Sequence, residues 1–167
     1  KANRISVDEA LNAIALDKFC DAPFIDWVES NSKRTPRQFT ARLPLKAEGE
    51  FNEGWYIQLS YKQTRYAGDR DKLCMGLMID HARTIAIDDN GVSRHINTNA
   101  GLGLPYYQKQ VGHPHCHRPT EDACYGYAEP IDTATPEEYW TMFLSRANIK
   151  KAPPFHLPRL QGELNYD

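Results

Sequence analysis

A histidine-rich segment in the C-terminal half of the chain holds the residues whose types and spacing suit chemistry. His113, His115 and His117 alternate with Pro114 and Cys116. On a β-strand, residues two apart point to the same face and lie roughly 6–7 Å apart, so two of these imidazoles can bind one Zn²⁺ through bonds of ~2.0–2.1 Å. His113 and His117 would lie ~13 Å apart on a straight strand, and all three meet only if the chain bends at Pro114. The spacing therefore predicts His115 and His117 as the working pair.

A metal centre requires ligands beyond this pair. Cys124, seven residues beyond His117, can loop back to it, whereas Cys116 points away from its flanking histidines on a regular strand. Other candidate ligands lie earlier in the chain, at Asp80, His81 and His95. The spacing H-x-H-x6-C differs from the common zinc-finger arrangements. We therefore keep two alternatives, a zinc ion on His115, His117 and Cys124, or no cofactor.

The same histidines can act without a metal. Imidazole has an unperturbed pKa near 6.5, so a neutral and a protonated histidine can serve as base and acid at neutral pH. Such a pair suits attack on a phosphodiester, with a nearby amide or guanidinium stabilising the charge of the phosphorane. Arg83 and Arg94 are the predicted substrate-binding residues. The predicted catalytic set is His95, Asn97, His113, His115 and His117.

The string H-x-H-x-H resembles the motif of the histidine-triad nucleotide hydrolases and transferases. In that family the x positions are apolar and the motif lies on a regular strand. Here these positions hold Pro114 and Cys116, and Arg118 follows the last histidine. These departures argue against membership of that family.

A wider resemblance covers about Leu77 to Ile149. The order "LMIDH", "RHINTNAG", "GHPHCH" and "EEYWTMFLSRANI" is similar to small bacterial and phage proteins with an Asp-ending strand, a His-x-Asn segment, a Gly-x-His-x-His strand and an aromatic helix. The resemblance implies that the recurring polar positions are His95, Asn97, His113 and His115. It implies no established activity.

The bulk composition is that of one globular domain. The chain has 167 residues, of which 41% are hydrophobic, which is enough for a core. We expect a single α+β domain over residues 1–150 and an extended C-terminal arm over residues 151–167. The net charge of −2 argues against a protein that coats nucleic acid by bulk electrostatics. No apolar run approaches the ~18–20 residues that span a bilayer, so no membrane partner is expected.

The cysteines indicate a reducing environment. The four are scattered along the chain, at Cys20, Cys74, Cys116 and Cys124. A secreted disulfide scaffold would be shorter and denser in cysteine. We therefore expect a cytoplasmic protein with free or metal-bound thiols.

Helical signals flank a β-rich middle. The capping box "SVDE" begins at Ser6, and the apolar spacing after it predicts a helix from Val7 to Phe19 or Cys20. A second predicted helix follows Thr135 and carries its aromatic residues on one face. Alternating apolar residues predict strands within residues 24–28, 38–45, 54–62, 73–80 and 84–88, with a short return strand over 93–97. Because short turns join neighbouring strands, we predict an α+β fold, a mostly antiparallel sheet of four to six strands with an N-terminal and a C-terminal helix packed on it.

Two classes of function remain after these observations. The first is a small soluble hydrolase or phosphodiesterase that acts on a nucleotide or RNA through the histidine cluster. The second is a binding or inhibitor module of a mobile-element or defence context, in which the cluster is structural and zinc-stabilised, and exposed Tyr106 and Tyr107 contact a protein partner. A closed site with four protein ligands favours the second class, and an open cleft favours the first. The oligomeric state stays open.

Overall fold

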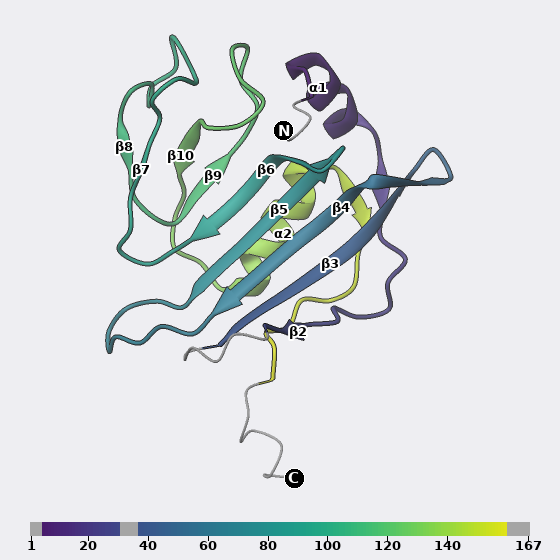
Figure 1. Ribbon diagram of the computed structural model, residues 1–167, viewed down its shortest axis with the longest axis horizontal. Coiled ribbons are helices and arrows are strands. Elements are labelled where there is room, and N and C mark those ends of the chain that lie inside the picture. Colours follow the sequence, from purple (N-terminus) through teal and green to yellow (C-terminus); the bar gives the residue numbers. More distant parts are fainter. Residues whose placement is uncertain (1–4, 31–36, 160–167) are drawn as a thin grey trace.

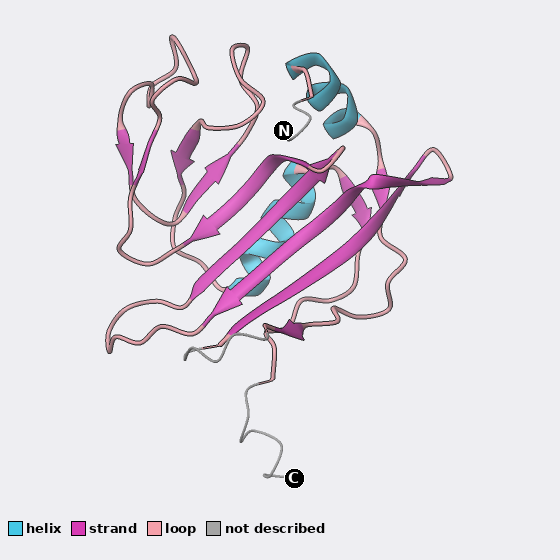
Figure 2. Ribbon diagram, in the orientation of Figure 1, coloured by secondary structure: helices cyan, strands magenta, loops and turns pink. Residues whose placement is uncertain are grey.

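The described part of the chain forms one large β-sheet with a helix behind it (Figures 1 and 2). The computed structural model describes residues 5–30 and 37–159. These residues form a mixed nine-stranded sheet along the path β10-β9-β6-β5-β4-β3-β1-β11, and β2 pairs with β3 beside this path. The strands of the sheet are β1 (Lys18–Phe19), β2 (Val28–Glu29), β3 (Gln38–Ala47), β4 (Glu50–Lys62), β5 (Lys72–Ile79), β6 (Ala82–Asp89), β9 (His115–His117), β10 (Ala128–Pro130) and β11 (Ile149–Lys151). A separate ribbon joins β7 (His95–Ile96) to β8 (Gln110–Val111), and the helices are α1 (Val7–Ala15) and α2 (Pro136–Arg146).

The α+β class is confirmed, but the sheet is larger than the predicted four to six strands. The additional strands β1, β10 and β11 are segments of two or three residues at its margins, too short to produce an alternating pattern in the sequence, and the predicted strand over residues 24–28 exists only as β2 at Val28–Glu29. β1 and β11 pair in parallel, and the other pairings within the described residues are antiparallel. The predicted return strand over 93–97 exists as β7, but it pairs with β8 rather than with β6.

The N-terminal helix is shorter than predicted and does not cover a face of the sheet. Ser6 caps it as expected, because its Oγ accepts a hydrogen bond from Glu9 N at 3.1 Å, but the helix ends at Ala15. The Nζ of Lys18 donates hydrogen bonds of 2.6–2.9 Å to three carbonyl oxygens that end the helix, those of Ala13, Ile14 and Leu16. The chain then joins the sheet as β1 instead of continuing the helix. In Figure 1, α1 lies beyond the ends of β5 and β6.

The second helix, α2, covers one face of the sheet and closes the core. Its N-cap is Thr135, whose Oγ1 accepts from Glu138 N at 3.2 Å. Tyr139, Trp140 and Phe143 are buried against the inward-facing strand residues, which include Leu43, Leu45, Ile57, Leu59, Met75, Leu77, Ile85 and Ile87. Figure 1 shows α2 behind the sheet, and neither helix covers the opposite face in this view. None of the helices within the described residues is long and apolar enough to cross a membrane.

The described end of the chain packs against the same core. After β11, the backbone carbonyl of Pro153 accepts a hydrogen bond from Trp140 Nε1 at 3.0 Å, and Phe155 is buried. The residues of the predicted arm from 160 onward lie outside the described residues. The C-terminal helix is therefore followed by a strand and a packed segment. The sequence did not predict them, because this proline-rich stretch has no apolar periodicity.

Side-chain alternation along β6 and β9 sends neighbouring residues to opposite faces of the sheet. In the register of these strands, Ile87 pairs with Cys116 and Asp88 pairs with His115. Ile87 and Cys116 belong to the core behind the sheet. Because successive residues of a strand point to opposite faces, Asp88, His115 and His117 point to the face that α2 leaves uncovered.

Candidate functional site

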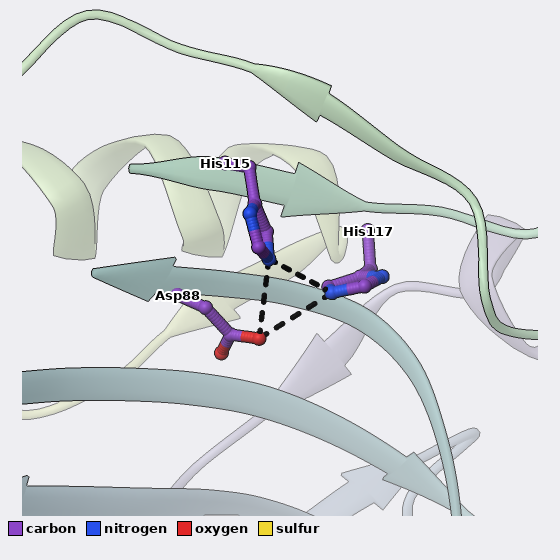
Figure 3. A group of neighbouring side chains, drawn as sticks. All are labelled: Asp88, His115 and His117. Carbon is purple, nitrogen blue, oxygen red and sulfur yellow. Dashed lines mark hydrogen bonds and ion pairs between the residues drawn. The ribbon is translucent and has the colours of Figure 1, made fainter. Parts of the chain in front are cut away.

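Three side chains from β6 and β9 converge on one point (Figure 3). The Nε2 atoms of His115 and His117 lie 3.0 Å apart. The Oδ2 atom of Asp88 lies 3.7 Å from His115 Nε2 and 3.4 Å from His117 Nε2. We call these three residues the Asp88 triad. Their side chains are at most 7% exposed, so the point of convergence is buried.

The separations within the Asp88 triad suit one tetrahedral metal ion. Ligand atoms bound tetrahedrally at ~2.05 Å lie about 3.3 Å from one another, and the three separations span this value. An octahedral ion with bonds of ~2.1 Å places neighbouring ligands about 3.0 Å apart, closer than two of the three separations. Two imidazoles and one carboxylate leave a fourth position for water or substrate, as in catalytic zinc sites. The donor set therefore fits Zn²⁺ with one open position.

The hydrogen bond of His115 Nδ1 orients its ring so that Nε2 can bind a metal ion. His115 Nδ1 lies 2.8 Å from the carbonyl oxygen of Gly112, which can only accept, so this nitrogen carries the proton. Its Nε2 consequently presents a lone pair to the centre of the Asp88 triad. Metal-binding histidines commonly donate their second ring proton to a backbone carbonyl in this way. Among the described residues, His117 Nδ1 has no hydrogen-bond partner.

Electrostatics hold Asp88 in its charged form. Burial alone would raise the pKa of this carboxyl group, but its contacts with the rings of His115 and His117 and the charge of Arg83 hold the pKa well below its usual range. Arg83 forms an ion pair with Oδ1, which leaves Oδ2 directed at the histidines. For His117, burial lowers the pKa although Asp88 acts to raise it. The centre therefore offers an ionised carboxylate and a neutral imidazole.

Arg83 reaches this site because Gly76 lies beneath it. The pairing of β5 with β6 is irregular between Gly76 and Met78, which shifts the start of β6 relative to β5. A Cβ atom at Gly76 would lie 3.2 Å from Arg83 Nε, so a side chain there would crowd the guanidinium. The predicted substrate-binding residue Arg83 thus touches the site. Arg94, the other residue predicted for that role, is exposed on the segment before β7.

The predicted bend at Pro114 is present, and His113 lies beside the Asp88 triad rather than within it. The peptide bond between His113 and Pro114 is cis. The His113 ring packs on that of His115 with centroids 4.1 Å apart, and its Nδ1 donates to Ser93 O at 2.7 Å. Burial lowers the pKa of His113. His113 therefore lies beside the pair, whereas His115 and His117 meet as predicted.

The two predicted residues of the His-x-Asn segment have different positions. His95 Nε2 donates to the carbonyl oxygen of Gly126 at 2.7 Å, and its ring lies edge-on to His117 with centroids 4.9 Å apart. Asn97 is fully buried, and its side-chain amide bonds only backbone groups, at Tyr106 and Ala128. His95 thus lies at the site, and Asn97 joins the end of β7 to the backbone of Tyr106 and to β10.

The cysteines and tyrosines of the histidine-rich region also have defined positions. Cys124 Sγ donates to Ile5 O at 2.9 Å, and Asp88 occupies the position beside the histidines for which Cys124 was the candidate. Cys116 faces the core, as the alternation predicts, and all four cysteines are free thiols. Tyr106 and Tyr107, proposed above as exposed contact residues, are half-buried.

Sequence reasoning missed Asp88 and Tyr125. Asp88 lies almost thirty residues before the histidines, as the last residue of the strand predicted over residues 84–88. A usable signal was present, because a carboxylate inside an apolar strand is rarely buried without a partner. Tyr125 stacks on the His117 ring with centroids 4.4 Å apart, and Arg83 lies 5.6 Å over the Tyr125 ring. Nothing in the local pattern distinguished this tyrosine from its neighbours.

Comparison of the chain with protein-family models, with curated proteins and with solved structures finds no match.

Proposed function

We propose that the protein is a metal-dependent hydrolase of phosphodiesters, with one Zn²⁺ held by Asp88, His115 and His117. The observation that carries this proposal is the convergence of Asp88 Oδ2, His115 Nε2 and His117 Nε2 at separations of 3.0–3.7 Å. Without a metal, the lone pair of His115 Nε2 and the charged Oδ2 of Asp88 face each other at 3.7 Å, and only His117 Nε2 can donate a proton between them. A divalent cation offsets that repulsion and lowers the pKa of a bound water to about 7.

The neighbouring residues support hydrolysis. Because His95 donates through Nε2 to a carbonyl, its Nδ1 has a free lone pair and can accept a proton. A zinc ion held by Asp88, His115 and His117 would make a bound water more acidic, and His95 would take the proton of that water as its oxygen attacks phosphorus. The bond from phosphorus to the leaving oxygen breaks, and that oxygen takes up the proton from His95. The guanidinium of Arg83, beside Asp88, can stabilise negative charge on the non-bridging oxygens.

Tyr125 controls the proposed access to the zinc ion. Its ring stacks on that of His117, and the residue is 38% exposed. Tyr125 and Arg83 also line an open cleft with the start of α1 and the loop that holds Asp122. In the observed position, the Tyr125 ring separates this cleft from the buried histidines. A rotation of the Tyr125 side chain would open a path from the cleft to the fourth metal position.

One observation favours a second candidate function. The side chains of the Asp88 triad are nearly inaccessible, as expected of a structural metal centre. In that case the ion stabilises the histidine-rich flank of a binding module that contacts a protein partner. The two candidates differ in the consequence of metal removal, because a structural ion contributes directly to folding.

The test combines metal content with activity on bis(p-nitrophenyl) phosphate. The proposal predicts one zinc per chain by elemental analysis, hydrolysis that chelation abolishes and Zn²⁺ restores, and a melting temperature that chelation lowers by only a few degrees. His95→Gln should retain zinc but lose at least about tenfold in kcat. Full retention of kcat in His95→Gln would remove His95 from the mechanism. Stoichiometric zinc without any hydrolysis, with unfolding on chelation, would favour the binding module.

A further inference from the structure

Two lysines face each other at one end of the uncovered sheet face. Lys62 on β4 and Lys72 on β5 are direct cross-strand partners, so their side chains project from the same face. Like charges directly opposite each other destabilise a sheet. Neither lysine forms an ion pair with any of the residues from 5–30 and 37–159. A bound anion between the two ammonium groups would offset this repulsion.

The lysine pair lies at a pocket with an exposed aromatic residue. The pocket is formed by the loop between β4 and β5 and by the turn after β6, and Arg65 contributes a further cation to its lining. Tyr66 also lines it and is 73% exposed, so its ring is open to a stacking partner. Asp69 is the carboxylate of the lining, and its Oδ1 accepts from Arg70 N at 2.8 Å. The pocket therefore combines an excess of positive charge with an aromatic surface.

This pocket adjoins the Asp88 triad. Lys72 and Cys74 share a face of β5, about 6–7 Å apart, and Cys74 is the direct cross-strand partner of Asp88. A second connection runs through Ser93, which lines the pocket and whose carbonyl oxygen accepts from His113 Nδ1 at 2.7 Å. The His113 ring in turn packs on His115. The Lys62–Lys72 pocket and the cleft beside Tyr125 therefore lie at opposite ends of β5 and β6, so a strand that fills both would pass the Asp88 triad.

We propose that this Lys62–Lys72 pocket binds the phosphodiester backbone of a single-stranded nucleic acid, with one base stacked on Tyr66. Positive grooves that follow the backbone, combined with aromatic stacking platforms, are the usual means of binding single strands without sequence readout. A duplex does not fit this arrangement, because its bases are stacked on one another. The inference names the substrate class of the proposed hydrolase and rests on that function for catalysis, but not for binding.

The test is fluorescence anisotropy with a labelled 12-nucleotide single-stranded RNA and the matching single-stranded DNA. The full chain carries His115→Ala, so that the oligonucleotide stays intact. Reversing both charges with Lys62→Glu and Lys72→Glu should weaken binding at least about tenfold and reduce the dependence of Kd on salt. Tyr66→Ala should weaken it roughly tenfold, while Tyr66→Phe should bind as the parent does.

Matched controls separate this inference from folding and from the metal site. Lys150→Glu makes the same charge change on β11, the edge strand that lies three strands from β4, and should change Kd less than twofold. Lys72→Glu should melt at or above the parent temperature, because it replaces a like-charge pair by an opposite pair. Binding within twofold of the parent after double charge reversal, or equal binding of a duplex, overturns the inference. Hydrolysis of the small diester without oligonucleotide binding overturns only this inference, and oligonucleotide binding without any hydrolysis overturns only the proposed function.

Discussion

The two faces of strands β6 and β9 are built from adjacent residues and have opposite chemistry. Behind the sheet, Ile87 and Cys116 pack into an apolar core that α2 closes. On the uncovered face, Asp88 and the two histidines bring three polar ligand atoms to one buried point. One step along either strand therefore separates a residue that stabilises the fold from one that holds the proposed metal.

The neighbouring carboxylates of β6 show the same difference. Asp88 faces the histidines, whereas Asp89 faces the other way, where Arg70 binds both of its oxygens at 3.0–3.1 Å. The hydroxyl of Tyr139 on α2 donates to Asp89 as well, at 3.3 Å. Asp88 thus belongs to the site and Asp89 stabilises the fold, because successive residues of the strand point to opposite faces. Substitutions at neighbouring positions should separate zinc binding from stability.

The largest expected effect is on the uncovered face. His115→Ala removes a ligand whose Nε2 lone pair faces the centre, so zinc affinity should fall about 1000-fold or more, which is about 4 kcal/mol. The metal-free protein should also lose stability, because the buried ring and its hydrogen bond to Gly112 O are removed, so zinc affinity is compared in the folded variant. Competition titration with a zinc chelator measures the affinity. An unchanged zinc affinity in His115→Ala would contradict the assignment of this ligand.

On the core face, truncation should affect stability and not zinc. Ile87 is 1% exposed, so Ile87→Ala should lower the free energy of unfolding by about 2–5 kcal/mol through lost burial and a residual cavity. The folded variant should still bind one zinc ion with near-parent affinity, although the substitution lies directly beside Asp88. Urea unfolding and zinc titration measure the two properties. A loss of zinc affinity as large as that of His115→Ala would mean that the two faces are not independent.

An intermediate effect is expected for the carboxylate on the structural side. Asp89→Asn weakens the ion pair with Arg70, whose side chain is 41% exposed, and should cost about 2 kcal/mol of stability. Zinc affinity should fall less than tenfold, through the bond from Arg70 Nη2 to His113 O at 2.9 Å. Asp88→Asn is the matched control and should reverse the pattern, with zinc binding nearly lost. Equal zinc affinities in the two variants would contradict the difference between these carboxylates.

Much of the structural side of this comparison is predictable from the sequence. The caps at Ser6 and Thr135 mark helix starts, and the alternation from residue 38 to 89 gives the four central strands, because these signals depend only on nearby residues. The shortest strands, such as β1 and β10, depend on partners far along the chain. For that reason the sequence did not reveal that Lys18 ends α1 or that β11 follows α2.

The site was predictable only within one segment. The pairing of His115 with His117 follows from a spacing of two on a strand. The third member, Asp88, depends on the register between β6 and β9, which a local pattern does not contain. Cys124 was chosen as a ligand because it is close in sequence, but its thiol contacts the segment before α1 instead.

The smallest expected effect is the pH dependence of stability in the metal-free protein. Burial lowers the pKa values of His113 and His117 in the folded state, so the unfolded state binds more protons and stability should fall as the pH drops below about 6.5. The lowered pKa of Asp88 should cause a further loss below about pH 3.9. Urea midpoints measured with a chelator between pH 8 and pH 3 test this. Constant stability from pH 7.5 to pH 5 would contradict the buried, neutral state of the histidines.

Zinc K-edge X-ray absorption on the zinc-loaded protein tests the central claim most directly. The account predicts a shell of nitrogen and oxygen atoms near ~2.0 Å with imidazole scattering from two histidines, and no sulfur scattering near ~2.3 Å. In Asp88→Asn the zinc signal should be lost or weakly bound. A zinc–sulfur distance of ~2.3 Å, which would indicate a cysteine ligand such as Cys124, or a protein that binds no zinc at micromolar concentration, would contradict the Asp88–His115–His117 centre.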